Sequence, residues 1–258
     1  MAWKRLPRRL QHGEEASLVE HLGELRTRLL IAIGSIFVTF PFAFAFNERL
    51  IAWLVEPLPD DRELITLGVT EPFFTSIKVS FLAAFALALP IVLYQLWSFL
   101  APAVEEHVQR VVSFFVAFAT VLFFGGVLFA YYVVMPRALG FLTSFNEDLF
   151  AVQIRASYYL SFVSFALVAM GLAFEMPIFM LALVRLRIVS AAALRRNWRL
   201  GIFFVVVGAI LLPTVDPVSL AFETVPLIIL YFLSVALATV MERRWERAAA
   251  EDWATSEY

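Results

Sequence analysis

The chain has 258 residues, of which 62% are hydrophobic and 16% are charged, and its formal net charge is −2 at pH 7. Soluble domains are roughly 45–50% apolar and about 25% charged. Here the charges fall between long uncharged runs, so the composition excludes a soluble globular domain and indicates a polytopic membrane protein. The chain contains no cysteine, which excludes disulfides, thiolate metal sites and thiol nucleophiles.

The first segment, 1–16, begins with the basic run MAWKRLPRRL and continues with the polar run QHGEE. A cleavable signal peptide carries an apolar core after its basic region, and no such core follows here. The pair Arg8 and Arg9 is similar to a twin-arginine export signal, but again no hydrophobic region follows closely. We therefore expect 1–16 to be a basic cytoplasmic tail.

A short amphipathic helix is predicted next, over SLVEHLGELRTRLL. Ser17, followed three residues later by Glu20, is a capping-box pattern that predicts the helix start. Apolar residues recur at helical spacing on one stripe, while Glu20, Glu24 and Arg28 lie on another face. The residues of the stripe are Leu18, Leu22, Leu25 and Leu29.

Glu24 allows two interpretations. Because the apolar run takes over at Leu29, its carboxylate is expected at the membrane boundary, where it can hold a cationic ligand. Alternatively, Glu24 and Arg28 form an ordinary solvated i, i+4 pair, worth about 0.2–0.5 kcal/mol. The residue pattern alone leaves both interpretations open.

A helix needs about 20 apolar residues to cross the hydrocarbon core of a bilayer. The segment 17–240 is expected to be a membrane domain with six such spans. The fifth is short, since its 13 residues cover only about 20 Å at 1.5 Å per residue. The expected spans are 29–46, 73–100, 111–135, 158–184, 200–212 and 218–240.

The distribution of Lys and Arg supports six crossings. With six, fifteen of the 20 Lys and Arg residues share the side of the two termini. The positive-inside rule then places both termini in the cytoplasm, including a C-terminal tail over 241–258. Two of the predicted outer loops, 47–70 and 136–157, are long enough to fold into a cap.

Three prolines fall inside expected spans, at Pro90, Pro177 and Pro226. Proline removes a backbone donor and clashes with the preceding turn, so each predicts a bend. Three bent helices favour a concave wall over a tight cylinder.

Glu175 is the one acid deep in an expected span. Such residues usually face protein or a wet cavity, or are protonated. It is therefore either an intramembrane polar site or a neutral acid hydrogen-bonded to a neighbouring helix. Asp216 and Glu223, near the start of the last span, are explained as acids stabilised by the helix dipole.

Soluble-enzyme chemistry has no support in the sequence. His12, His21 and His107 are scattered, and the chain contains no HExxH, GxSxG or GxxxxGK[ST] motif. We expect no metal or other cofactor, and no nucleic acid partner. Energy must therefore come from a partner or from the membrane potential.

Eight sequence segments occur in an order that is typical of one family. They are HLGELRTRLL (21–30), EPL (56–58), TEPFFTSIKVS (70–80), PIVLYQLWSFLAPAV (90–104), FAYYVVMPRALGFL (129–142), YLSFV (159–163), GLAFEMPI (171–178) and LPTVDPVS (212–219). Together they resemble TatC, the six-span receptor subunit of the twin-arginine protein translocase. The resemblance covers nearly the whole chain.

The resemblance implies an all-α, glove-like concave bundle with short fifth and sixth helices. It also implies that the acid of the HLxELR motif, here Glu24, binds the paired arginines of export signal peptides. The guanidinium fork suits a carboxylate partner. The other positions that the resemblance marks are Arg26, Pro57, Phe99, Glu175 and Asp216, and Pro177 follows the family glutamate.

The sequence departs from the family pattern at two places. The second signal-binding acid before the third span falls on Val108, so Glu105 or Glu106, one turn upstream, would have to replace it. An acid that commonly follows the tyrosine of the sixth span is replaced by Phe232, after Tyr231. Partner docking near the last two helices is therefore expected to differ.

The expected function is that of a non-enzymatic receptor in a prokaryotic plasma membrane. It would bind twin-arginine signal peptides of folded cargo, self-associate, and assemble with the single-span partners TatA and TatB, driven by the proton-motive force. The alternative is a secondary transporter or channel for a small solute, with Glu175 as a proton-coupled site. An intramembrane hydrolase lacks the paired acids or the Ser and His arrangement that it needs.

Overall fold

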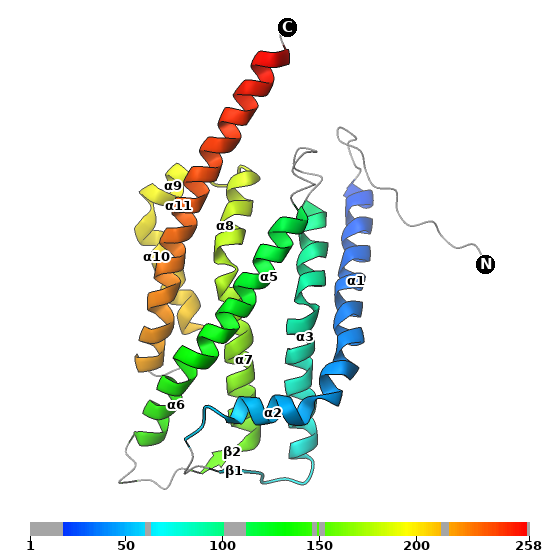
Figure 1. The fold of residues 1–258 in the computed structure, drawn as a ribbon, viewed down its shortest axis with the longest axis vertical. Helices are drawn as coiled ribbons and strands as arrows, with labels where there is room; N and C mark the ends of the chain where they lie inside the picture. The colour runs from blue at the N-terminus through cyan, green and yellow to red at the C-terminus, as the bar shows by residue number, and fades with distance from the viewer. Residues whose placement is uncertain are drawn as a thin grey trace, which may run out of the picture. The chain divides into compact units, whose positions relative to one another are not determined.

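The computed structural model describes residues 18–59, 63–100, 112–145, 149, 153–212 and 217–256. The chain divides into two compact units. The first contains residues up to Ile51 together with Ser76–Val121, and the second contains Ala52–Thr75 and everything from Leu122 onward. Figure 1 labels the helices and strands of both.

Among the described residues, the first unit contains α1 (Leu18–Ala45), the start of α2 (Asn47–Val55), the part of α3 (Glu71–Leu100) after Thr75, and the start of α5 (Val112–Phe129). The hydroxyl of Thr39 on α1 donates a hydrogen bond to the carbonyl of Ala84 on α3 at 2.9 Å. Small and hydroxyl residues that join neighbouring helices in this way are typical of membrane bundles.

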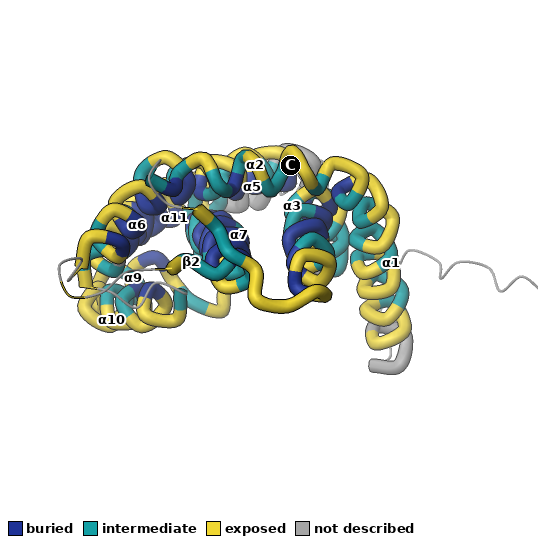
Figure 2. Tube along the Cα trace, turned by 90° about the horizontal axis from the view of Figure 1, so that it is seen from below, coloured by how far each residue is buried: buried dark blue, intermediate teal, exposed yellow. Residues whose placement is uncertain are grey.

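The α1 helix begins at Leu18, next to the predicted cap, whereas Ser17 lies outside the described residues. The predicted leucine stripe is not covered: Leu22, Leu25 and Leu29 are all more than 40% exposed. Figure 2 shows α1 as exposed or intermediate over almost its whole length. This apolar surface suits a lipid environment better than water.

The second unit contains the remaining helices. The end of α5 continues into a π-helical turn, η2 (Ala130–Val134), and then into α6 (Met135–Ser144). The last helix, α11, packs along α8 and α10, and the centre of the unit is the buried α7 (Figure 2). The remaining elements are α7 (Ala156–Phe174), α8 (Met176–Arg185), α9 (Ala191–Arg196), α10 (Trp198–Ile210) and α11 (Pro217–Ser256).

Glycine permits close approach of neighbouring helices in this core. A Cβ atom placed on Gly171 of α7 would lie 2.6 Å from the ring of Phe123 on α5. Phe123 is fully buried, so its ring has little room to move away. Close contacts of this kind replace the hydrophobic driving force that is missing between helices in lipid.

Five helices among the described residues are long and apolar enough to cross a membrane, and Trp198–Ile210 is a shorter apolar helix. The segment expected as the short fifth span thus forms a short helix, since α10 has 13 residues, and its crossing of the membrane stays a prediction. The five long segments are Leu22–Ala45, Glu71–Phe99, Phe115–Ser144, Ala156–Arg185 and Leu220–Arg247.

The two long loops that were predicted on the outer side contain more structure than expected. The first holds α2 (Asn47–Val55), and half of the second is helical, because the third span continues through Pro136 to Ser144. Pro136 stands in the first turn of α6, where proline is tolerated. The two loops pair through the short parallel strands β1 (Leu64–Ile65) and β2 (Ile154–Arg155), so the chain is not purely α-helical.

The expectation of a short last helix is wrong. The α11 helix has 40 residues and continues through the predicted tail to Ser256, because Met, Glu, Arg and Ala in 241–250 are strong helix formers. Tertiary contacts also hold its extension: the Glu242 carboxylate accepts a hydrogen bond from the Ala191 amide at 3.2 Å, and the Arg185 guanidinium lies 4.7 Å from the Trp245 ring.

The three predicted proline bends have different outcomes. At Pro177 the helix is broken, since α7 ends at Phe174 and α8 begins at Met176. The helices α3 and α11 continue through Pro90 and Pro226 without a break. Neighbouring groups in membrane bundles can satisfy the carbonyl that proline leaves free, so a proline alone does not end a span.

Candidate functional site

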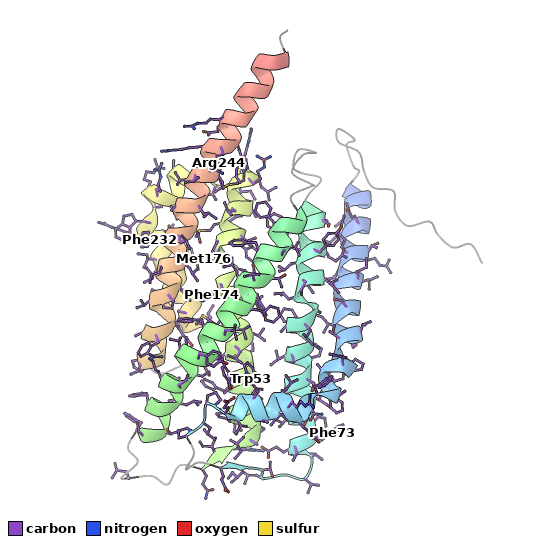
Figure 3. The ribbon with its side chains drawn as sticks, in the orientation of Figure 1. Trp53, Phe73, Phe174, Met176, Phe232 and Arg244 are labelled. Carbon is purple, nitrogen blue, oxygen red and sulfur yellow. The ribbon has the colours of Figure 1, made fainter. Side chains whose placement is uncertain are left out.

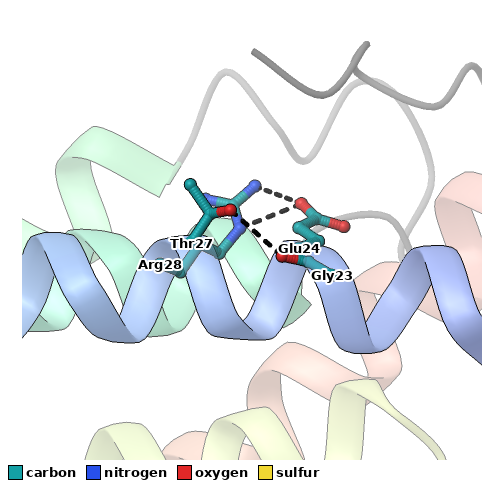
Figure 4. A network of polar contacts seen from close by, with 4 residues as sticks. All are labelled: Gly23, Glu24, Thr27 and Arg28. Carbon is teal, nitrogen blue, oxygen red and sulfur yellow. Dashed lines mark hydrogen bonds and ion pairs between the residues drawn. The ribbon is translucent and has the colours of Figure 1, made fainter. Parts of the chain in front are cut away.

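The first candidate site residue, Glu24, lies in the second turn of α1. Its Oε1 accepts hydrogen bonds from Nε of Arg28 at 2.9 Å and from Nη2 at 2.5 Å (Figure 4). Each of the two side chains is 20% exposed. The predicted i, i+4 pair therefore forms, and the carboxylate already holds a guanidinium.

Only one oxygen of Glu24 takes part in this pair. Within the part of the chain that the structure describes, Oε2 accepts no hydrogen bond, and it is directed away from Arg28 in Figure 4. A carboxylate has about four acceptor positions, so Glu24 retains the capacity for a second guanidinium. The observed pair and a ligand role are thus compatible.

The other predicted binding residues are only partly placed. Arg26 is exposed on α1, and Phe99 is half-buried near the end of α3, two residues after Trp97, whose ring stacks on Phe115 at 5.3 Å. Arg26 and Phe99 belong to the first unit, as does Glu24. Glu105, Glu106 and Asp216 lie outside the described residues.

Pro57 follows α2 and is half-buried in the second unit. The residues just before Pro57 are held by Tyr131. Its hydroxyl donates to the Glu56 carboxylate at 2.9 Å and lies 2.8 Å from the Trp53 carbonyl. The rings of Tyr131 and Trp53, the latter labelled in Figure 3, stack at 4.0 Å. Pro57 therefore ends a firmly anchored turn, in keeping with a structural role.

An ion pair that the sequence did not indicate joins the start of α3 to β2. Nε of Arg155 donates to Oε1 of Glu71 at 2.8 Å, the Ser157 amide donates to the same oxygen, and the Leu67 amide donates to Oε2 at 2.9 Å. The side chain of Glu71 is only 5% exposed. The adjacent carboxylate raises the pKa of Arg155 above its ordinary value. The sequence carries no signal for this pair, because its members stand 84 residues apart.

Glu175 occupies the break between α7 and α8, whose flanking residues Phe174 and Met176 are labelled in Figure 3. It is 1% exposed, and neither carboxyl oxygen has a hydrogen-bond partner among the described residues. Pro177, also buried, follows in the first turn of α8. The sequence predicted an intramembrane polar site or a neutral acid hydrogen-bonded to a neighbouring helix. Among the described residues the carboxyl group is enclosed and accepts or donates no hydrogen bond, and its role stays a prediction.

Replacing Glu175 by methionine is expected to raise the melting temperature of the purified chain by about 2–4 °C. This is the shift that roughly 1 kcal/mol produces in a chain of this size, and a buried polar group without a partner costs at least about that much. Thermal unfolding in detergent would measure it. Glu246→Met, at an exposed acid of α11, should give no such gain, and a lower melting temperature for Glu175→Met would show that its carboxyl is satisfied.

Glu223 lies in the second turn of α11 and is 2% exposed. This agrees with its predicted place near the start of the last span, and its stabilisation by the helix dipole stays a prediction. Among the described residues, Glu71, Glu175 and Glu223 are three buried acids of the second unit.

Together, these features define a multi-pass helical membrane protein whose first span begins with a charged, guanidinium-binding face. The chain belongs to the TatC family, since the family model "Sec-independent protein translocase protein (TatC)" matches residues 20–226. Twin-arginine translocation is the transport system of that family.

Relatives and solved structures agree with this assignment. The TatC protein of Magnetococcus marinus is 35% identical over 93% of this chain and 92% of its own length. That of Aquifex aeolicus is 38% identical over 88% of this chain and 96% of its own. A crystal structure of the twin-arginine translocase receptor TatC in DDM has a TM-score of 0.76 and 35% identity, covering 84% of this chain and 99% of the other.

Proposed function

We propose that this chain is the receptor subunit of a twin-arginine translocase in the plasma membrane of a prokaryote, with six spans and both termini in the cytoplasm. It binds the signal peptides of folded precursors without catalysing a reaction itself. The proton-motive force drives transport. The concave, glove-like bundle expected from the family resemblance belongs to the same proposal.

The observation that carries this function is the carboxylate of Glu24. It stands within the HLGELR motif at the entry to the first span, and it binds the Arg28 guanidinium in the way that it would bind an arginine of the signal peptide. Charge-assisted bonds between carboxylates and guanidinium groups are among the strongest in proteins. Arg26 and Phe99 would complete this site, with Glu105 or Glu106 in place of the missing second acid.

The partners follow from the same proposal. TatA and TatB would dock on the membrane-facing helices, copies of this chain would associate with one another, and the bilayer would surround the assembly. Pro57 and Asp216 would support the outer face. Glu175, whose carboxyl group has no partner among the described residues, would supply the intramembrane polar contact for the inserted peptide or a partner helix.

Site-specific photocrosslinking tests the receptor role. A photoreactive residue at position 27, one turn from Glu24 on α1, or at position 105, 106 or 175 is combined with a precursor carrying either two arginines or two lysines in its signal. We expect crosslinks from position 27 with the arginine pair and their loss with the lysine pair, because an ammonium cannot reproduce the guanidinium fork that the intact Glu24 carboxylate binds.

The second candidate function, a small-solute transporter that uses Glu175, rests on the buried acid. It predicts solute flux into liposomes that contain this chain alone. Such flux, together with arginine-independent crosslinking at position 27, would replace the receptor by the transporter.

A further inference from the structure

A groove with a volume of about 810 Å³ lies in the second unit, along α7, α8, α10 and α11. Its walls are almost wholly apolar and include several small residues, so the protein's own side chains leave it open. Representative lining residues are Ala169, Ala173, Phe179, Leu200, Phe204 and Gly208. Its size falls in the range of sites that enclose small apolar ligands.

The groove offers few polar groups along its length. The Tyr231 hydroxyl, one of them, already donates a hydrogen bond to the Leu194 carbonyl at 3.2 Å. Asn197 lies at the end next to α9, while Leu212 lies at the other end of α10. An occupant must therefore be apolar over most of its length.

One end of the groove is strongly basic. Arg195, Arg196 and Arg199 are exposed there, and each lies within two residues of the lining residue Leu194 or Asn197. No carboxylate of the described residues pairs with Arg195 or Arg196. The nearby Glu242 binds the Ala191 amide instead. The charge at this end thus remains available for an anion.

An aromatic residue lies at the same basic end of the groove. Trp198 is 43% exposed at the start of α10, and the Arg199 guanidinium lies 5.6 Å from its ring. Exposed tryptophan is enriched at the headgroup level of a bilayer. Contact with the ring face leaves the N–H groups at the guanidinium edge free to donate to a phosphate.

We propose that this groove binds an anionic phospholipid. An acyl chain lies along α10, and the phosphate is held by Arg195, Arg196 and Arg199. The asymmetry favours this occupant: a uniformly apolar partner helix would gain nothing from arginines at one end, whereas an amphiphile with one charged end matches both features. This site is additional to the signal-peptide receptor role and does not depend on it.

Native mass spectrometry of the full chain in detergent, titrated with phosphatidylglycerol or phosphatidylcholine, tests the site. We expect several-fold greater retention of phosphatidylglycerol, and loss of that preference in the double variant Arg196→Gln, Arg199→Gln. Gly208→Leu should lower the retention of both lipids, since a Cβ at Gly208 meets no atom within 4 Å and a leucine there fills the groove. Gly34→Leu, equally unhindered but on α1, is the matched control and should change nothing.

Equal retention of the two lipids, or no effect of Gly208→Leu, would overturn the lipid site. If Gly208→Leu left lipid retention unchanged and also released a co-purified single-span protein, the occupant would be a partner helix.

Discussion

Glu24→Gln is expected to weaken binding of a synthetic twin-arginine signal peptide by about 1.5–3 kcal/mol, the usual size of a hydrogen bond to a charged group. This corresponds to a rise in Kd of roughly one to two powers of ten. The carboxylate loses its charge while the side chain keeps its shape and its place on α1. Titration of the purified chain with a fluorescent peptide measures the change.

Two further variants separate binding from folding. Arg28→Gln removes the guanidinium that competes for Oε1 of Glu24, so it should leave peptide affinity unchanged or modestly higher. Glu48→Gln, at an exposed acid of α2, should have no effect. Because an i, i+4 pair contributes only about 0.3–0.5 kcal/mol, neither Glu24→Gln nor Arg28→Gln should lower thermal stability appreciably. Unchanged affinity in Glu24→Gln would remove this residue from the site.

Gly201→Ala is expected to destabilise the second unit by about 1–3 kcal/mol, the usual cost of overpacking a well-packed core. A Cβ atom at this position on α10 would overlap the ring of Tyr231 on α11. Tyr231 is 2% exposed and its hydroxyl is bonded to the Leu194 carbonyl, so the ring cannot swing away without losing that bond. Denaturation of the purified chain in detergent measures the effect.

A double-mutant cycle tests this explanation. In a Tyr231→Leu background the obstructing part of the ring is gone, and Gly201→Ala should cost much less than in the wild type. Gly208→Ala is the matched control in the same helix. Because it meets no neighbouring atom within 4 Å, it should stabilise α10 by roughly 0.5–1 kcal/mol, the usual gain when alanine replaces helical glycine. Equal costs of Gly201→Ala in both backgrounds would contradict the contact with Tyr231.

The sequence was most informative where one local property decides the structure. Run lengths of apolar residues located the long helices and the short α10, and a proline beside an intramembrane acid located the break at Glu175. The ends of helices were predicted less well. A span that is predicted from hydropathy ends at the first charged residues. The strong helix formers after Val240 nevertheless continue α11 into polar surroundings.

Contacts between distant segments could not be predicted. Nothing local to Glu71 indicates Arg155 as its partner, and nothing local to Gly201 indicates the ring of Tyr231. For the candidate site, the i, i+4 spacing predicted the pairing of Glu24 with Arg28, whereas the ligand role that the family motif implies for Glu24 stays a prediction. The sequence did not indicate that Glu175 is completely enclosed, because burial depends on how α7 and α8 pack against the rest of the unit.

The pairing of β1 with β2 also constrains the order of biogenesis. β1 ends at Ile65, and its partner β2 begins only at Ile154. The intervening α3, α5 and α6 must therefore be synthesised and threaded through the bilayer before the two strands can meet. Closing so long a connection carries an entropic cost that only later contacts can offset. The ion pair between Glu71 and Arg155 is therefore a late event in membrane insertion.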